Sequence, residues 1–594
     1  MRTSLAILLI LSANIRAAEQ RPNILWITSE DNGHYLRCFG DEMARTPNLD
    51  GLAKRGTRFT HCFSNAAVCA PARQTLISGM YATSIGGQHM RSDATFPKGV
   101  HYFPKHLRDA GYYTSNNSKT DYNGGPADRK NAMTDAWDDS SRKGHWRNRP
   151  AGKPFFAVFN IGTSHESNLF PNKWKKRELK TDPAKVKLPK YLPDLPETRR
   201  DLARYYDCIE TMDEGVGKTL RELRADGLEE NTIVFYFGDH GGSMPRGKSF
   251  TYDSGTRVPL IVRIPEKWEH LRATKPGSKT DRLVSFVDFA STVLRLAKID
   301  VPDYMQGQPF VGGKPSEPRK YVHTFRGRRG ERYDLVRGVR SKRFLYLRNY
   351  TPHLPVMQYN GYSFAIPGYV AWMKAVQAGA CSPIQSQWFK PKSVEELYDT
   401  RKDPDNVHNL AADPKYAEAL AQHRAENERH MAAIRDSAFF PEGMTRRVYE
   451  EYQDEETYPL NRLQALASAT NASDFITAMS DENPCVRYWG IMGCLVHRPE
   501  KANTSLEKLL RDPEPLIRLQ AARALCGLRK HPTAAALLRE QLQSKDEILQ
   551  LRAVLAIDEC GLFDRSLTTA LRKIKGSYAK RVVQHIFSKH KDEQ

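Results

Sequence analysis

The chain has 594 residues, of which 40% are hydrophobic and 27% are charged, and its formal net charge is +21 at pH 7. This composition excludes a disordered or fibrous chain and is typical of a globular protein. The length exceeds what one core supports, so two or three domains are expected. A strongly basic surface attracts polyanions. The sequence has neither zinc-finger spacing nor an aromatic RNA-binding motif, so we expect no nucleic-acid partner.

The N-terminus has the pattern of an export signal. Arg2 is followed by an apolar run from Leu5 to Leu11 and by small residues that end at Ala17 and Ala18. We therefore predict a signal peptide over residues 1–18, cleaved near Ala17 or Ala18, and a periplasmic or secreted protein. A retained anchor is the alternative. An exported basic protein meets sulfated polysaccharide more readily than nucleic acid, although a generic basic surface explains the charge as well.

Nine cysteines give an odd count, which in an exported protein leaves at least one of them unpaired. Cys69 is the candidate for that role. The sequence contains no Cys-x-x-Cys pair, so a structural zinc site is not expected. The cysteines are Cys38, Cys62, Cys69, Cys208, Cys381, Cys485, Cys494, Cys526 and Cys560.

The first half alternates between apolar strand-like runs and helical patterns. This alternation predicts an α/β domain with a mainly parallel central sheet over residues 21–315. Ligands bind beyond the carboxyl ends of the strands in such sheets. Chemically useful residues follow three of the predicted strands: Glu30 and Asp31, then His165, then Asp239 and His240. The predicted strands are 23–28, 58–64, 112–116, 154–161, 232–237 and 258–263, and the predicted helices are 46–56, 106–111, 199–226 and 286–296.

Two further regions follow along the chain. Short strands at 333–340 and 343–350 and a charged helix ending near residue 437 predict a small α+β subdomain over residues 316–440. Residues 455–594 contain three segments that begin with aspartate and end in Arg487, Arg518 or Arg552. Each is followed by a helix rich in small residues. This pattern resembles HEAT repeats, helix pairs that stack to share a core and that usually bind a protein partner or scaffold. An irregular helical domain is the alternative.

The stretch from Ala66 to Gly79 carries the most informative chemistry. Its centre is Cys69-Ala-Pro-Ala-Arg73, where the proline suits the first turn of a helix. A cysteine at a helix N-terminus lies where backbone N–H groups favour negative charge, and Arg73 adds a donor for sulfate or phosphate oxygens. These residues fit an activated nucleophile that faces an oxyanion. A buried structural cysteine fits them equally well.

Cys-x-Pro-x-Arg followed by Leu-x-Ser-Gly resembles the signature of the type I sulfatases, and the likeness extends in order from Arg21 to Ala412. The resemblance implies an alkaline-phosphatase-like fold. It also implies that Cys69 is oxidised to formylglycine (3-oxoalanine) by a formylglycine-generating or an anaerobic sulfatase-maturing enzyme. In that family one hydroxyl of the hydrated aldehyde attacks sulfur, and the second then expels sulfate.

The resemblance implies one metal ion per chain, which we expect to be Ca²⁺. Clustered carboxylates suit calcium, a cation with about 6–8 oxygen ligands. The family more often has aspartate at position 30 and asparagine at position 240. The histidine shifts the preference toward Mn²⁺ or Zn²⁺, which remain alternatives. The implied ligands are Glu30, Asp31, Cys69, Asp239 and His240.

Four more residues complete the implied machinery: Arg73, the lysines Lys119 and Lys248 for the sulfate, and His165 as general acid for the leaving group. Lys119 matches the lysine of the family motif Gly-Lys-x-His, but Asp121 occupies the histidine position and can hydrogen-bond within the site or meet a substrate cation. Arg91 and His101 are candidates for the wall of the substrate pocket, and a surface loop explains them at least as well.

The sequence thus predicts an exported sulfatase that acts on sulfated carbohydrate. Short segments of the sequence resemble those of the N-sulfoglucosamine sulfohydrolase branch of the family, which adds an N-sulfate as a second candidate target. A phosphate or phosphonate monoester hydrolase of the same superfamily is the second hypothesis. The third is a non-catalytic polysaccharide-binding or scaffold protein, because Glu30, Asp121 and His240 depart from the family pattern.

Overall fold

The computed structural model describes residues 20–92, 94–125, 130, 133–174, 178–314, 316–444 and 449–590, with the backbone alone at 449–450. The predicted signal peptide, residues 1–18, lies outside the described residues. Among the helices that are described, none combines the length and apolar character that a membrane crossing requires. All nine cysteines are free thiols.

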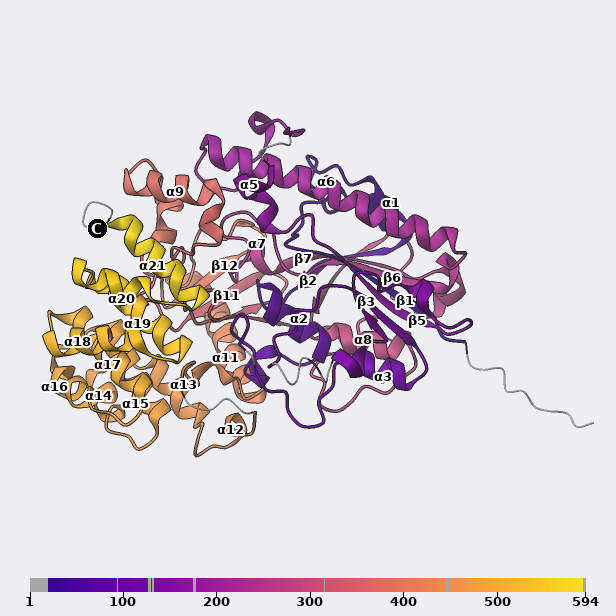
Figure 1. Ribbon diagram of the computed structural model, residues 1–594. Coiled ribbons are helices and arrows are strands. Elements are labelled where there is room, and N and C mark those ends of the chain that lie inside the picture. The colour runs from indigo at the N-terminus through magenta and orange to yellow at the C-terminus, as the bar shows by residue number, and fades with distance from the viewer. Residues whose placement is uncertain are drawn as a thin grey trace, which may run out of the picture.

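An eight-stranded sheet forms the centre of the first domain (Figure 1). The strand order is β4-β3-β5-β1-β6-β7-β2-β8, and β7 alone runs antiparallel to both of its neighbours. The prediction of a mainly parallel α/β sheet is therefore confirmed. The strands are β1 (Asn23–Ser29), β2 (Thr57–Phe63), β3 (Tyr113–Asn117), β4 (Asp139–Ser140), β5 (Phe155–Ile161), β6 (Thr232–Gly238), β7 (Arg257–Arg263) and β8 (Lys279–Ser285).

Helices cover both faces of this sheet, because its central strands are apolar on both sides. In β1, Leu25 and Ile27 pack in a core with α1 (Pro47–Arg55) and the long helix α6 (Pro196–Ala225). Ile24 and Trp26 point the other way, toward α2 (Cys69–Ser78), α3 (Pro104–Asp109) and α8 (Asp288–Leu296). In Figure 1, α6 runs along one side of the sheet and α3 and α8 lie on the other.

The second region is a four-stranded antiparallel sheet with the order β12-β11-β10-β9. Its strands are β9 (Val322–Arg326), β10 (Val336–Arg340), β11 (Phe344–Asn349) and β12 (Glu395–Asp399), and α11 (Ala417–Ala433) packs on it through Leu420. The excursion between β11 and β12 carries α9 (Pro367–Gln377) and α10 (Pro383–Ser386). Gly368 at the start of α9 donates its N–H to Asp201 of α6 (2.6 Å), which ties this region to the first domain.

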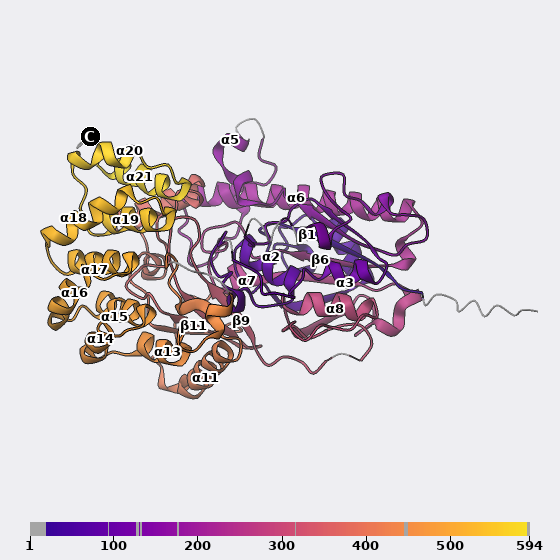
Figure 2. The ribbon, with the colours of Figure 1, turned by 60° about the horizontal axis from the view of Figure 1, so that its bottom comes forward.

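The third region is a stack of helices, which Figure 2 shows as a ladder beside the first two regions. Arginines of the repeated pattern stabilise the turns between the helices of the stack. Arg487 and Arg518 each donate to two backbone carbonyls of the loop before their own helix. Arg552 instead lies 4.0 Å from the ring centre of Tyr333 in the second region. The helices are α12 (Tyr449–Gln453), α13 (Leu460–Ser468), α14 (Ala472–Ala478), α15 (Pro484–His497), α16 (Asn503–Leu509), α17 (Pro515–Leu528), α18 (Pro532–Glu540), α19 (Glu547–Glu559), α20 (Thr568–Arg572) and α21 (Ser577–Lys589).

One apolar core joins the repeats to the second region. Phe439 and Met431 belong to the same cluster of buried side chains as Trp489 and the repeat helices behind it. The indole N–H of Trp489 donates to the carbonyl of Phe439 (2.8 Å), and the two rings are 5.0 Å apart. The stack of repeats is thus packed onto the rest of the chain through a shared apolar interior.

Candidate active site

The site is built where neighbouring parallel strands end. Strands β1 and β6 are paired in register, with Ser29 beside Gly238. The residues that follow, Asp31 and Asp239, therefore meet at one edge, and the N–H of Asp31 donates to Oδ1 of Asp239 (3.0 Å). Both side chains are fully buried. The expectation that strand ends bring these carboxylates together is confirmed.

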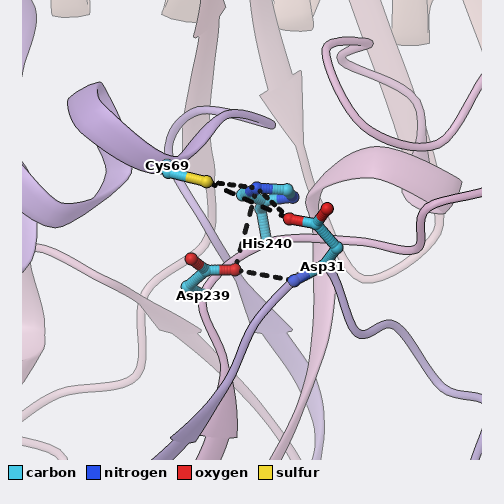
Figure 3. A group of neighbouring side chains, drawn as sticks. All are labelled: Asp31, Cys69, Asp239 and His240. Carbon is cyan, nitrogen blue, oxygen red and sulfur yellow. Dashed lines mark hydrogen bonds and ion pairs between the residues drawn. The ribbon is translucent and has the colours of Figure 1, made fainter. Parts of the chain in front are cut away.

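Cys69 reaches this pair from the first position of α2. Its Sγ lies 3.3 Å from Nε2 of His240 and 4.0 Å from Oδ1 of Asp31. His240 in turn lies 3.0 Å from the same oxygen of Asp31. Figure 3 shows these side chains and Asp239 pointing toward one another. One ligand atom from each of the four lies within 4.8 Å of the others, and all four residues are buried. The arrangement is a compact donor set for a metal ion.

Glu30 is the one predicted metal ligand outside this group. Its Oε2 lies 2.8 Å from Nζ of Lys119. The opposite charges form an ion pair at the entrance to the site, and this pair directs the carboxylate toward Lys119. Lys119 also lies 3.7 Å from Oδ2 of Asp239. The longer side chain of Glu30 thus lies between the group of candidate metal ligands and the predicted sulfate-binding lysine.

Lys248 and His165 border the other side of Asp31. Nζ of Lys248 lies 2.9 Å from Oδ2 of Asp31, 2.9 Å from Oε1 of Glu166 and 3.2 Å from Nε2 of His165. His165 is carried by the turn after β5, the strand beside β1. Lys248 comes from the long connection between β6 and β7. The structure thus brings both predicted residues to the same cluster as Cys69.

Arg73 lies beside Asp239, one of the candidate metal ligands. Its Nε is 3.4 Å from Oδ2 of Asp239, and another guanidinium nitrogen donates to Oδ1 of Asn160 (2.9 Å). The third guanidinium nitrogen is buried without a hydrogen-bond partner. The structure therefore places Arg73 against a carboxylate of the site, one helical turn from Cys69.

The concentration of charge shifts the acidities of these groups. Burial alone raises the pKa of the Cys69 thiol, but Lys119 and Lys248 outweigh it and lower the pKa to about 6. Burial lowers the pKa of His240, yet Asp239, Cys69 and Asp31 raise it to about 10. Burial raises the pKa of Asp239, whereas His240, Lys119 and Arg73 bring it down to about 2. The buried carboxylates of the cluster thus favour positive charge, which is what a cation site requires.

A cavity of about 180 Å³ opens above Cys69. Six of its lining residues are predicted site residues: Cys69, Arg91, Lys119, Asp121, His165 and Lys248. At the rim, Nε of Arg91 lies 3.7 Å from Oδ1 of Asp121. The placement of Arg91 and Asp121 in this wall agrees with the sequence prediction that they approach the substrate.

His101 does not line the cavity, and its predicted place there is wrong. Its carbonyl accepts a hydrogen bond from Tyr304 (3.3 Å), and its ring lies 6.1 Å from that of His106 at the start of α3. The loop that carries it packs on the flank of the sheet domain.

Sequence reasoning missed several residues of the cavity wall. Glu166 is buried between Lys248 and Arg329, and its backbone N–H donates to Asp31 (2.7 Å). Its position next to His165 was the available signal. Five other lining residues come from distant segments and have no local signal: Arg329, Asn360, Tyr362, Tyr578 and Arg581.

Comparisons with known proteins agree with this geometry. A family model described as Sulfatase matches residues 22–299, and one described as HEAT repeats matches residues 472–558. An ulvan-active sulfatase of Formosa agariphila is 38% identical over 474 residues, which cover 71% of this chain and 77% of that protein. The N-sulphoglucosamine sulphohydrolase of Homo sapiens is 25% identical over 464 residues, with 67% and 87% covered.

A solved structure of a 2-O GAG sulfatase superposes with a TM-score of 0.52 at 19% identity, covering 70% of this chain and 93% of that one. This likeness bears on the fold alone, and it confirms the expected alkaline-phosphatase-like architecture. The chain belongs to the sulfatase family, whose members are sulfuric ester hydrolases. It also carries HEAT repeats, which follow the catalytic region in the sequence.

Proposed function

We propose that this sulfatase is exported and removes sulfate from sulfated carbohydrate, by means of a formylglycine made from Cys69 and one bound divalent metal ion. The observation that carries the proposal is the position of Cys69. It lies at the floor of a cavity, 3.3 Å from His240 of the metal cluster, with the cations Lys119 and Lys248 in the same wall. A tetrahedral dianionic or monoanionic ester group fits a pocket with this charge.

The substrate class rests on two supports. Two relatives are an ulvan-active sulfatase and an N-sulphoglucosamine sulphohydrolase, and both names refer to sulfated sugars. The net charge of +21 suits a polyanionic polysaccharide. We extend the proposal to N-sulfate as a second target, because of the local resemblance to the sulphohydrolase branch.

The donor set of the cluster fits a metal ion. Two buried carboxylates and an imidazole converge with Sγ of Cys69, and the pKa of His240, raised by Asp239 and Asp31, shows that the pocket attracts positive charge. Asp31, Asp239 and His240 would hold the ion together with an oxygen of the modified Cys69. When bound, the ion supplies a Lewis acid that polarises the oxygens of the ester and of the nucleophile. We propose Ca²⁺, with Mn²⁺ and Zn²⁺ as the alternatives that His240 favours.

The remaining roles follow from position. Lys119 and Lys248 line the same cavity as Cys69 and would bind the sulfate oxygens. His165 has one ring nitrogen, Nδ1, beside the hydroxyl of Ser167 (2.9 Å), and its Nε2 turns toward Lys248 and the cavity. Burial lowers the pKa of His165, but Asp31 outweighs this and raises it above its usual value, which favours a proton on the ring. His165 would give that proton to the leaving oxygen or nitrogen.

The first test is the chemical state of Cys69 in protein purified from its native host. Mass spectrometry of the peptide that contains Cys69 is expected to show the mass of the aldehyde or its hydrate. Cys69→Ala should lower the rate of sulfate release from a panel of sulfated glycan fragments by at least about 10³-fold. An unmodified thiol, with tight glycan binding and no turnover, would instead support the non-catalytic hypothesis.

A second test separates sulfate from phosphate. We expect faster hydrolysis of 4-nitrophenyl sulfate than of 4-nitrophenyl phosphate or a phosphonate monoester, with the glycan panel as reference because sugar-specific sulfatases can ignore small aryl esters. Preferred release of phosphate or phosphonate would favour the second hypothesis.

The metal is tested by removal. Treatment with a chelator is expected to abolish sulfate release, and Ca²⁺ alone should restore it. Metal analysis of the purified protein should then give about one calcium per chain. Restoration by Mn²⁺ or Zn²⁺ but not by Ca²⁺ would assign the softer ion.

Export is tested by locating the mature protein. N-terminal sequencing of protein from the periplasm or medium should begin after Ala17 or Ala18. A chain found in the cytoplasm with its first residues intact would contradict this part of the proposal.

A further inference from the structure

The last helix of the HEAT repeats borders the catalytic cavity. Tyr578 and Arg581 of α21 line the same cavity as Cys69 and Lys119, although about 500 residues of sequence separate the two groups. In Figure 2, α20 and α21 form the terminal layer of the stack. A module that was expected to bind a protein or act as a scaffold thus contributes side chains to the active site.

The contribution of α21 is one cation and one aromatic ring. The guanidinium of Arg581 lies 5.5 Å from the ring centres of both Tyr362 and Tyr578. Its side chain remains 32% exposed, so it can meet a ligand that enters the cavity. Tyr578 lines the cavity together with Arg91. Two arginines and two tyrosines therefore surround the entrance, beyond the lysines that face Cys69.

Specific contacts fix the position of α21. Nη1 of Arg581 lies 3.6 Å from Oε2 of the buried Glu331, and this oxygen has no hydrogen-bond partner. The ring of His585 stacks on Tyr359 with centres 3.8 Å apart and planes 12° from parallel. Lys589 pairs with Asp558 of α19 at 2.7 Å. Arg581 and His585 thus hold the helix against the second region and Lys589 holds it against α19, which gives Arg581 a defined place.

We propose that α21 completes the substrate site: Arg581 binds a second anionic group of the saccharide, a carboxylate or another sulfate, while Tyr578 contacts the sugar ring. This inference rests on the proposed function, because it assumes a sulfated saccharide in the cavity. Arginine is suited to both kinds of oxyanion through paired N–H donors. An aromatic ring supplies a flat apolar surface with little loss of side-chain entropy. The repeats would then select polyanionic carbohydrate.

The experiment measures turnover and binding in the full-length protein. The substrates are a sulfated disaccharide that contains a uronic acid, the same disaccharide with its carboxyl group reduced, a disulfated analogue, and 4-nitrophenyl sulfate. Kinetics use the mature enzyme, and isothermal titration calorimetry with the same disaccharides uses the Cys69→Ala variant. The variants are Arg581→Ala and Tyr578→Ala.

Arg581→Ala is expected to raise KM for the uronic-acid or the disulfated disaccharide by about tenfold, with kcat within twofold, because a contact made equally in ground and transition state is lost. KM for the carboxyl-reduced disaccharide and for 4-nitrophenyl sulfate should remain unchanged. If KM rises for the uronic-acid disaccharide, the group that Arg581 binds is a carboxylate. If KM rises for the disulfated disaccharide, the group is a second sulfate. Tyr578→Ala should weaken binding of all the disaccharides alike.

Two control variants separate recognition from structure. Lys580→Ala removes the same charge from the neighbouring, exposed position of α21 and should change no constant by more than twofold. Arg581→Lys keeps a cation at the same position and should retain part of the affinity for the anionic disaccharides. If Arg581→Ala weakens binding of the carboxyl-reduced disaccharide as much as binding of the anionic disaccharides, the role of Arg581 is structural and the proposal is overturned.

The outcomes also separate this inference from the proposed function. If wild-type enzyme releases sulfate and the KM values of Arg581→Ala equal those of Lys580→Ala, the inference is wrong and the function stands. If no saccharide is desulfated but calorimetry still shows an affinity that depends on Arg581, the inference stands and the catalytic proposal fails.

Discussion

Lys248 holds two buried carboxylates at once. It is 2% exposed and lies 2.9 Å from both Asp31 and Glu166. Burial lowers the pKa of Lys248, but Asp31, Cys69 and Glu166 raise it well above its usual value, so the lysine is charged. The main effect of this charge on stability appears when it is removed. The buried carboxylates then lose their partner, and an unpaired buried carboxylate lowers the stability of the folded protein.

The prediction at this scale concerns Lys248→Met. In chelator-treated protein we expect a loss of about 3–5 kcal/mol of stability, measured as a shift of the urea unfolding midpoint, because two buried negative charges lose their partner. The double variant Lys248→Met/Glu166→Gln removes one of those charges and should recover about 1–3 kcal/mol. A double variant whose destabilisation equals the sum of the two single effects would show that the pair is not coupled.

At the scale of elements, the site depends on how closely the ends of β1 and β6 approach. Gly238 is the last residue of β6, and a Cβ at this position would lie 2.1 Å from the carbonyl oxygen of Asn32. Asn32 follows Asp31, and Asp239 follows Gly238. The absence of a side chain at residue 238 therefore allows the two metal-ligand loops to meet.

Gly238→Ala is expected to separate these loops, lowering the melting temperature and reducing both metal affinity and sulfate release by at least about 10²-fold. The matched control is Gly51→Ala in the middle of α1, where an added Cβ meets no atom within 4 Å. That change should stabilise the protein by about 0.5–1 kcal/mol through reduced freedom of the unfolded chain. Normal metal binding in Gly238→Ala would disprove the role assigned to this glycine.

At the scale of the molecule, the repeats and the second region share one core. The buried cluster that contains Phe439 and Met431 continues without a break into α15, α17 and α19. A large apolar interface couples the stability of the parts that it joins. The repeats should therefore not unfold separately while the rest stays native.

We expect a single cooperative transition on heating, with loss of helical circular dichroism and loss of sulfatase activity at the same temperature. Trp489→Ala removes a buried ring and the hydrogen bond to Phe439, at a cost of about 3–5 kcal/mol, and should lower both midpoints together. Repeats that melt first and leave an active enzyme would contradict the shared core.

Local pattern was enough to predict much of this architecture. Apolar runs gave β1, β5 and β6, and the residues after them gave Asp31, His165 and Asp239, because parallel strands that end at one edge bring together whatever follows them. The spacing of aspartate and arginine predicted the repeats. β8 was missed because five of the seven residues in Lys279–Ser285 are polar, and its first four residues are exposed or half-buried at the edge of the sheet.

The sequence by itself determined the family signature, the strand-end carboxylates and the position of Cys69, which we propose as the precursor of the nucleophile, since each depends on neighbours within a few residues. The tertiary structure alone decided which further cations join Lys119 and Lys248: Arg329 meets Glu166 across 163 residues, and Arg581 enters the same cavity from the last helix. No short-range pattern specifies such pairs, because they form only when the sheet domain, the second region and the repeats pack together. Most of the active-site wall therefore depends on the packing of the whole chain, whereas Cys69 and Arg73 come from one five-residue motif and Asp31, Asp239 and His240 follow the ends of two paired strands.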